Sequence, residues 1–227
     1  MVILEDGEIE RALFENREEA IIPIEITERD GDIEIITFEK TESVARELEK
    51  RFSSSLFSDE AIEFIHSRLI DTVHEWGYEV DDLGEGHIIT FVHKNLNVDL
   101  ILPTTKMIKS SKGYVNMTEY ELENLDEDSE ECYFATIIDN KIVSICEMNT
   151  QGVFIGAVEI NTYTSPEYRG NGYSSSNVTA MCKYLGEKGK KIAYTVQTEN
   201  STSISVAEKC GFEKIAQTYY YICYRND

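Results

Sequence analysis

The glycine-rich segment at residues 166–173, PEYRGNGY, constrains the fold of this chain more than any other feature. Residues 155–164 before it have the pattern of a strand, and residues 174–187 after it have the pattern of a helix. The unpaired N–H groups of a first helical turn, together with the helix dipole, favour negative charge. Gly170 and Gly172 would let the backbone approach a ligand without a Cβ in the way. The segment therefore predicts a site for a phosphate or a pyrophosphate.

Three kinds of loop could bind such a ligand, and two of them do not fit. A P-loop needs a lysine that does not follow Gly172, and a dinucleotide-binding loop needs a third glycine where Ser175 stands. Residues 169–174, RGNGYS, resemble the third kind, the Arg/Gln-x-x-Gly-x-Gly/Ala loop that binds the coenzyme A pyrophosphate in the GNAT superfamily of N-acetyltransferases. Ser174 takes the place of the small final residue. Taken alone, the loop also fits an ordinary strand-to-helix turn.

A second motif in the same order strengthens the resemblance. GNAT proteins carry an Asn after the fifth strand, a small residue three positions later, and a Gly-Phe that ends the fourth helix. Asn200, Ser203 and Gly211–Phe212 match that order, between a predicted strand at 192–196 and another at 215–224. The resemblance covers about the last 100 residues and is closest to a bacterial GNAT subgroup with a variable N-terminal half.

The resemblance implies acetyl-CoA as cosubstrate and assigns residues to it. The end of the fourth strand would contact the pantetheine, the loop would hold the pyrophosphate, and the fifth strand's Asn motif would line the other side. In this chain the implied cofactor-binding residues are Thr162, Tyr163 and Thr164, then Arg169, Gly170, Asn171, Gly172, Tyr173 and Ser174, then Asn200 and Ser203.

The catalytic residues are less clear from the sequence. In the family, a tyrosine seven positions after the Asn often protonates the leaving thiolate, and here that position holds Ala207. Tyr219 on the last predicted strand is a candidate replacement, although tyrosines on a strand commonly pack a half-buried face. Glu159 is the candidate general base because it shares a strand face with Tyr163, and a solvent-facing role is the alternative.

The charge of the chain is concentrated in its first part. The 227 residues include 43 Asp and Glu against 21 Lys and Arg, a net charge of −22. Residues 1–130 hold nearly all of that excess, so residues 131–227 are close to neutral. Such a surface repels nucleic acid. It could attract a cationic amine, or it could serve solubility alone.

Composition excludes several other classes of protein. No apolar run is long enough to span a membrane, and the N-terminus lacks the pattern of a secretion signal. The five cysteines form no Cys-x-x-Cys pair and the four histidines have no zinc spacing, so we expect a cytoplasmic protein without a metal. As partners we expect a small-molecule or peptide amine acceptor, no nucleic acid and no membrane, and we leave a homodimer open.

The N-terminal half predicts a smaller α+β region. Two strands at 20–26 and 32–39 flank an Asp-Gly turn, helices follow at 43–52 and 59–76, and strands at 87–93 and 98–102. The acidic run 121–131 is the best boundary, which gives 1–125 as an acidic region on the acceptor side and 126–227 as the acetyl-CoA-binding domain. The first strand and two helices of a complete GNAT fold would lie between about 87 and 128, or be replaced.

These observations together predict an α/β (α+β) protein with a GNAT mixed sheet in its C-terminal half. The function that the resemblance implies is an N-acetyltransferase that moves an acetyl group from acetyl-CoA directly to a primary amine in a ternary complex. The alternative is a non-catalytic acyl-CoA-binding sensor or an interaction module with the same fold.

Overall fold

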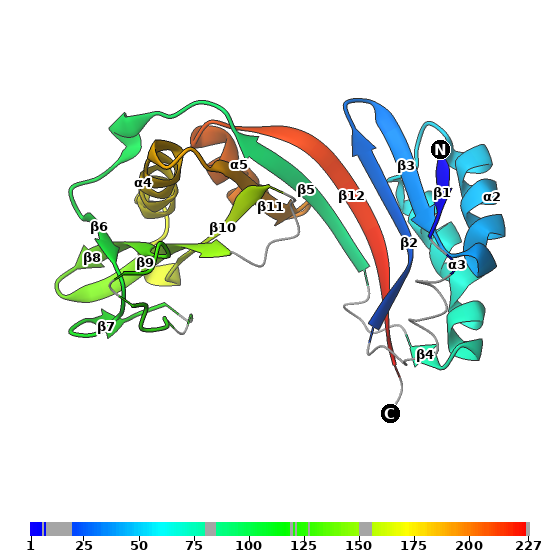
Figure 1. Ribbon diagram of the computed structural model, residues 1–227, viewed down its shortest axis with the longest axis horizontal. Coiled ribbons are helices and arrows are strands. Elements are labelled where there is room, and N and C mark those ends of the chain that lie inside the picture. Colours follow the sequence, from blue (N-terminus) through cyan, green and yellow to red (C-terminus); the bar gives the residue numbers. More distant parts are fainter. Residues whose placement is uncertain are drawn as a thin grey trace. The chain divides into compact units, whose positions relative to one another are not determined.

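The computed structural model describes residues 1–5, 7, 20–79, 85–118, 120, 122–126, 128–149 and 156–225 (Figure 1). The chain forms two compact units, one of Met1–Ile89 with Ala216–Asp227 and the other of Thr90–Ile215. The strands β5 (Glu85–His93) and β12 (Phe212–Arg225) contribute residues to both. These bounds differ from the predicted division at residue 125.

The first unit combines a sheet with two helices on one side of it (Figure 1). Its strands follow the order β1-β3-β2-β12, with only β1 and β3 parallel, and β4 pairs with the end of β12. The elements are β1 (Val2–Leu4), β2 (Ala20–Arg29), β3 (Asp32–Thr37), the 3-10 helix η1 (Glu39–Thr41), α2 (Glu42–Phe52), α3 (Asp59–Glu75) and β4 (Tyr78–Glu79).

Local sequence explains why these elements form. Asp30 and Gly31 adopt positive φ angles of 53° and 85°, which closes the predicted hairpin between β2 and β3. The Ser58 hydroxyl accepts a hydrogen bond from the Ala61 amide and so caps α3. The predicted helix at 59–76 is confirmed as α3, and the residues of its apolar stripe are buried in the core of this unit or packed against it: Ile62, Ile65, Leu69, Val73 and Trp76.

The second unit is built on a mixed sheet in the order β5-β11-β10-β9-β8-β6. Helix α4 lies against β8, β9 and β10 (Figure 1). The elements that follow β5 are η2 (Val98–Leu100), β6 (Thr105–Ile108), β7 (Val115–Asn116), β8 (Tyr133–Ile138), β9 (Lys141–Asn149), β10 (Ala157–Thr164), η3 (Pro166–Tyr168), α4 (Tyr173–Glu187), β11 (Lys191–Gln197), α5 (Ser201–Lys209) and the start of β12.

The predicted order of elements in the C-terminal half is confirmed. The β8–β9 hairpin turns at Asp139 and Asn140, which have φ angles of 48° and 64°. The strand at 155–164 and the helix at 174–187 are present as β10 and α4, while residue 155 lies outside the described residues. The strands at 192–196 and 215–224 lie within β11 and β12.

The prediction of a strand at 98–102 is wrong. Residues Val98–Leu100 form the 3-10 helix η2, because the Asn97 carboxamide accepts a hydrogen bond from the Asp99 amide and caps a helical turn. Strand β6 takes the edge position beside β8. Between 87 and 128, the described residues contain no α-helix, so the two helices expected there are not found in that part of the chain.

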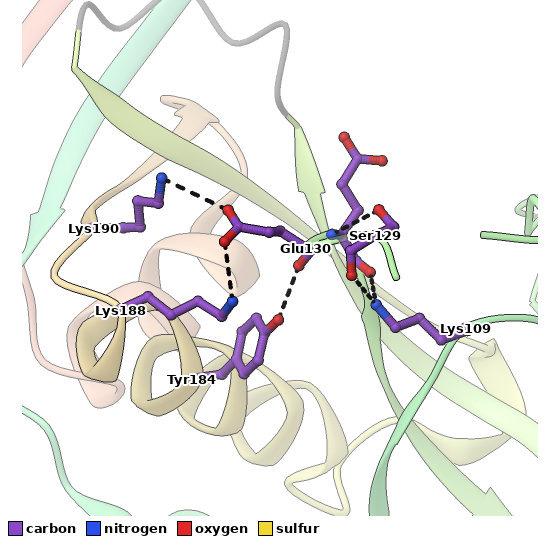
Figure 2. A network of polar contacts seen from close by, with 7 residues as sticks. Lys109, Ser129, Glu130, Tyr184, Lys188 and Lys190 are labelled. Atoms are coloured by element: carbon purple, nitrogen blue, oxygen red, sulfur yellow. Dashed lines mark hydrogen bonds and ion pairs between the residues drawn. The ribbon is translucent and has the colours of Figure 1, made fainter. Parts of the chain in front are cut away.

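Residues 129–131, at the end of the acidic run that we took for a boundary, are fixed to the second unit (Figure 2). The Tyr184 hydroxyl donates to the Glu130 carbonyl at 3.0 Å, and Lys188 and Lys190 of the same region form ion pairs with the Glu130 carboxylate at 3.4 Å and 4.0 Å. Lys109 donates to the Ser129 carbonyl at 2.6 Å. Charge density suggested a domain boundary, but Lys109, Tyr184 and Lys188, which come from other segments, bind residues 129–131 and connect them to the rest of the second unit.

Candidate functional site

A fork between two parallel strands forms one wall of the site. Strand β10 pairs with β11 from Ala157 to Glu159, and the pairing ends there. On its other side β10 stays paired with β9 as far as Thr164. The last residues of β10 therefore have one backbone edge that is not used in the sheet. Such an edge offers N–H and C=O groups to a ligand.

The N-terminus of α4 forms the facing wall. Gly172 is the N-cap with φ of 78°, and no side chain in the described part of the chain caps this helix. The Ser176 amide is the one that donates to the Gly172 carbonyl, at 2.9 Å. The amides of the preceding turn have no acceptor within the helix, so they are available to an anion. A Cβ added at Gly170 or Gly172 would meet no protein atom within 4 Å.

Two side chains shape the loop between these walls. The Arg169 Nε donates to the Thr164 carbonyl at 3.1 Å, which ties the loop to the end of β10. The Asn171 Nδ2 donates to the carbonyls of Tyr168 and Arg169, at 3.0 Å and 3.2 Å. Asn171 thus stabilises the loop's conformation, because its side chain hydrogen-bonds the loop's own backbone.

Hydroxyl groups hold α4 in register with the strands beneath it. The Ser174 and Thr162 hydroxyls lie 3.0 Å apart, and Thr162 also donates to the Ile145 carbonyl at 2.7 Å. These contacts join the first turn of the helix to β10 and, through it, to β9. Because both hydroxyls are partly buried, the distance between the two walls is fixed by short, desolvated bonds.

A buried asparagine completes this support. The Asn177 Oδ1 accepts hydrogen bonds from the hydroxyls of Thr105 at 3.1 Å and Thr136 at 3.0 Å, and its Nδ2 donates to the Ser144 hydroxyl at 3.1 Å. One side chain therefore connects α4 to β6, β8 and β9. A buried amide with several partners specifies one arrangement of these elements.

The third wall comes from α5. The Asn200 Oδ1 accepts from the Ser203 amide at 3.0 Å and caps the helix. Asn200 and Ser203 of the predicted second motif thus lie at the start of α5. Ala207, at the position of the family's tyrosine, is buried.

A cavity of about 800 Å³ lies between these walls. Every predicted cofactor-binding residue except Asn171 lines it. The sequence had not singled out the other lining residues, which are Tyr120, Tyr168, Ser175, Thr202, Ser205, Val206 and Lys209. Tyr168 and Ser175 lie within or next to the recognised loop, whereas Tyr120 comes from a distant segment that no local pattern connects to it.

The cavity is electropositive in a strongly acidic protein. Among its lining residues the charged ones are Arg169 and Lys209, and none of the lining residues is acidic. The open amides of α4 add partial positive charge at the same end. The wall therefore favours an anionic ligand of the size of a nucleotide.

Comparisons with known proteins agree with this geometry. A family model described as FR47-like protein matches residues 139–221. A GNAT-family protein of known structure from Novosphingobium aromaticivorans aligns with a TM-score of 0.51 at 15% identity, over 66% of this chain and 69% of that one. The chain therefore has the fold of GNAT proteins.

Other solved GNAT structures align over similar spans. A GCN5-related N-acetyltransferase-like protein from Streptococcus suis is 18% identical, with a TM-score of 0.45 over 66% of each chain. A GNAT-family acetyltransferase from Colwellia psychrerythraea is 10% identical, with a TM-score of 0.46 over 62% of this chain and 56% of that one. No curated protein sequence matches significantly.

The two predicted catalytic residues do not line the 800 Å³ cavity. Glu159 is flanked by Ala193 of β11 and Asn149 of β9, before the fork opens. Tyr219 belongs to the first unit, where its buried hydroxyl donates to the Glu85 carboxylate at 3.0 Å. Burial, and then the Glu85 charge, raise the pKa of Tyr219. Their catalytic roles remain predictions.

Within the described ranges, no group of three His, Cys, Asp or Glu side chains is placed to hold a metal ion. None of the helices in the described part of the chain combines the length and apolar character of a membrane span.

Proposed function

We propose that this GNAT protein is an N-acetyltransferase that moves an acetyl group from acetyl-CoA to a primary amine of a small molecule or peptide. The observation that supports it best is the single cavity in which the open amides of α4 meet the unpaired edge of β10. One wall suits a diphosphate and the other suits an amide-rich chain, which is the chemical layout of coenzyme A.

The fit of the cofactor follows from the residues present. Backbone amides from Gly170 to Ser174 would hold the diphosphate, with Arg169 and Lys209 supplying charge. Without a Cβ, the two loop glycines leave space that a phosphate can enter, since nothing lies within 4 Å of a Cβ built there. The free edge of β10 from Thr162 to Thr164 would hydrogen-bond the pantetheine amides.

The chemistry needs a positioned thioester and a neutral amine. Attack of the amine on the thioester carbonyl gives an oxyanion, which a backbone N–H at the fork can stabilise. The carbon–sulfur bond then breaks and the thiolate takes up a proton. The transfer is direct within a ternary complex, so no covalent intermediate on the protein is required.

Binding and turnover test the proposal together. Calorimetry with acetyl-CoA should show binding, and thiol release with a panel of primary amines should show transfer. Gly172→Trp should abolish binding because its side chain would fill the diphosphate position. Gly189→Trp is the matched control, since Gly189 also has a positive φ, of 71°, and open surroundings but lies beyond the other end of α4. Unchanged binding in Gly172→Trp would contradict the proposal.

The second candidate is an acyl-CoA-binding module without catalysis, and Ala207 favours it. This buried alanine stands where the family often has the tyrosine that protonates the thiolate. Acetyl-CoA binding without thiol release from any amine would select this candidate. No heat and no thermal shift with acetyl-CoA would instead favour an interaction module that has lost its ligand.

A further inference from the structure

The two faces of the β9–β10 ribbon have different neighbours. Helix α4 covers the face that carries Thr162 and Ser144, because Ser174 contacts Thr162 and Asn177 contacts Ser144. Side chains alternate along a strand, so Tyr163 and Asn161 project from the opposite face. That opposite face is where a second substrate can approach without displacing α4.

The cavity extends to this opposite face. The Tyr163 ring packs against the Tyr120 ring with centroids 5.5 Å apart, and both residues line the cavity together with Ser174 of α4. The opening at the fork is therefore reached from both sides of the sheet. An acyl group held at the end of β10 would face an acceptor that lies on the tyrosine side.

A carboxylate that does not itself line the cavity shares a sheet face with Tyr163, which does. Glu147 of β9 is directly opposite Asn161 of β10 in the antiparallel ladder, and directly opposite residues place their side chains on the same face. Asn161 is two positions before Tyr163, so Glu147 shares the face of Tyr163. The Asn161 side chain hydrogen-bonds the Glu147 carboxylate, which orients it.

We propose that Glu147 is the proton acceptor for a cationic primary amine that docks on this face, beside Tyr120 and Tyr163. The inference rests on the function proposed above and assigns its acceptor side. The ammonium group gives one proton to the Glu147 carboxylate, and the neutral amine attacks the thioester carbonyl to form the carbon–nitrogen bond. When the carbon–sulfur bond breaks, the second proton of the nitrogen passes to the thiolate. Glu147 then releases its proton to solvent, and the products are an amide and free coenzyme A.

Glu147 is better placed for this role than Glu159. Both carboxylates lie on the same face, because Glu159 and Asn161 are two positions apart on β10. Glu159, however, pairs with Asn149 on one side and Ala193 on the other, where the sheet is still closed. The Glu147–Asn161 pair lies one step farther along, past the last β10–β11 pair.

The surroundings of Glu147 suit a base. Burial raises the pKa of Glu147, the nearby Glu123 charge raises it further, and the hydrogen bond from Asn161 opposes them. Tyr133 and Cys146 are further titratable groups that interact with Glu147. A carboxylate whose pKa is raised is a stronger base. The two carboxylates and the two aromatic rings also favour a cation over a neutral acceptor.

The test is the pH dependence of turnover in Glu147→Gln with the best amine of the panel. We expect kcat/KM to fall by about 10²–10⁴-fold at neutral pH, the range that general base catalysis contributes. In the wild type, protonation of Glu147 should lower kcat/KM at acidic pH. This acidic limb should disappear in the variant, whose kcat/KM should then depend on pH only through the ionisation of the amine. Calorimetry should show acetyl-CoA affinity close to that of the wild type. Glu213→Gln, at an exposed position of β12, is the control and should keep the wild-type profile.

Two outcomes separate this inference from the function beneath it. If the wild type turns over and Glu147→Gln stays within about threefold of it while Glu159→Gln loses activity, the assignment of the base is overturned and the acetyltransferase stands. A wild type that binds no acetyl-CoA, or releases no thiol with any amine, overturns both.

Discussion

Replacing Asn177 with alanine removes the side chain that joins α4 to three strands. Its carboxamide makes hydrogen bonds to Thr105, Thr136 and Ser144, all between 3.0 Å and 3.1 Å. Asn177 is fully buried, so water does not replace these bonds in the folded state. The variant therefore measures how much the hydrogen bonds of this buried carboxamide contribute to the free energy of unfolding.

The expected loss of stability is about 3 kcal/mol, because each of the three bonds contributes roughly 1 kcal/mol net. Two of the partners keep other contacts, since Thr105 also lies 2.6 Å from the Ser176 hydroxyl and Ser144 lies 2.7 Å from the Thr164 hydroxyl. The buried Thr136 hydroxyl would lose the one hydrogen bond that it makes in the described part of the chain, so about 3 kcal/mol is the lower end of the expected loss. For a chain of this length, about 3 kcal/mol lowers Tm by roughly 6–12 °C.

Thermal unfolding followed by circular dichroism measures the effect. Asn95→Ala is the control, because its side chain is exposed and its backbone hydrogen bond to the Gly211 carbonyl does not depend on that side chain. If Asn177→Ala costs less than about 0.5 kcal/mol, as a surface substitution does, the amide does not hold these elements together and our reasoning fails.

Three further predictions concern other parts of the chain. Gly211→Ala should lower Tm far more than Gly189→Ala in the same melt. Both glycines have a positive φ, but a Cβ at Gly211 would lie 1.8 Å from the Asn95 carbonyl oxygen. Equal shifts in Tm would contradict this reasoning. Lys209→Ala should weaken acetyl-CoA binding about fivefold at low salt and less at high salt, measured by calorimetry. An unchanged affinity at low salt would show that Lys209 does not interact with the ligand. Glu147→Gln should gain Tm relative to the wild type as the pH rises from 4.5, the ordinary pKa of a glutamate. The pKa of Glu147 is higher in the folded protein, so the folded protein binds more protons than the unfolded chain. Wild-type stability therefore falls as the pH rises through this window, whereas the variant lacks this group. A constant Tm difference from pH 4 upward would refute that sign.

The local elements of the site could be predicted because their causes are local. Gly172 marks the start of α4, and Asn200 caps α5 through its own side chain, as the spacing indicated. The prediction at 98–102 was wrong for an equally local reason, since the Asn97 cap outweighed the apolar residues after it. Elements whose conformation depends on near neighbours were within reach of pattern analysis.

The ion pairs of Glu130 could not be predicted in this way. In the sequence it belongs to an acidic run, and like charges in a row suggest a solvated linker. In the fold its carboxylate forms ion pairs with Lys188 and Lys190, which lie some sixty residues later (Figure 2). Charge patterning along the chain contains no information about partners that the fold brings from elsewhere.

The amino-acid sequence by itself determined the strand, loop and helix that present amides to an anion, because glycine φ angles and helix caps depend on a few consecutive residues. Only the tertiary structure decided what faces that loop. The contact of Tyr120 with Tyr163, and the position of Glu147 opposite Asn161, depend on strand register and loop closure between distant segments. Those are set by the packing of the whole sheet, where a shift of one residue would turn each of these side chains to the other face.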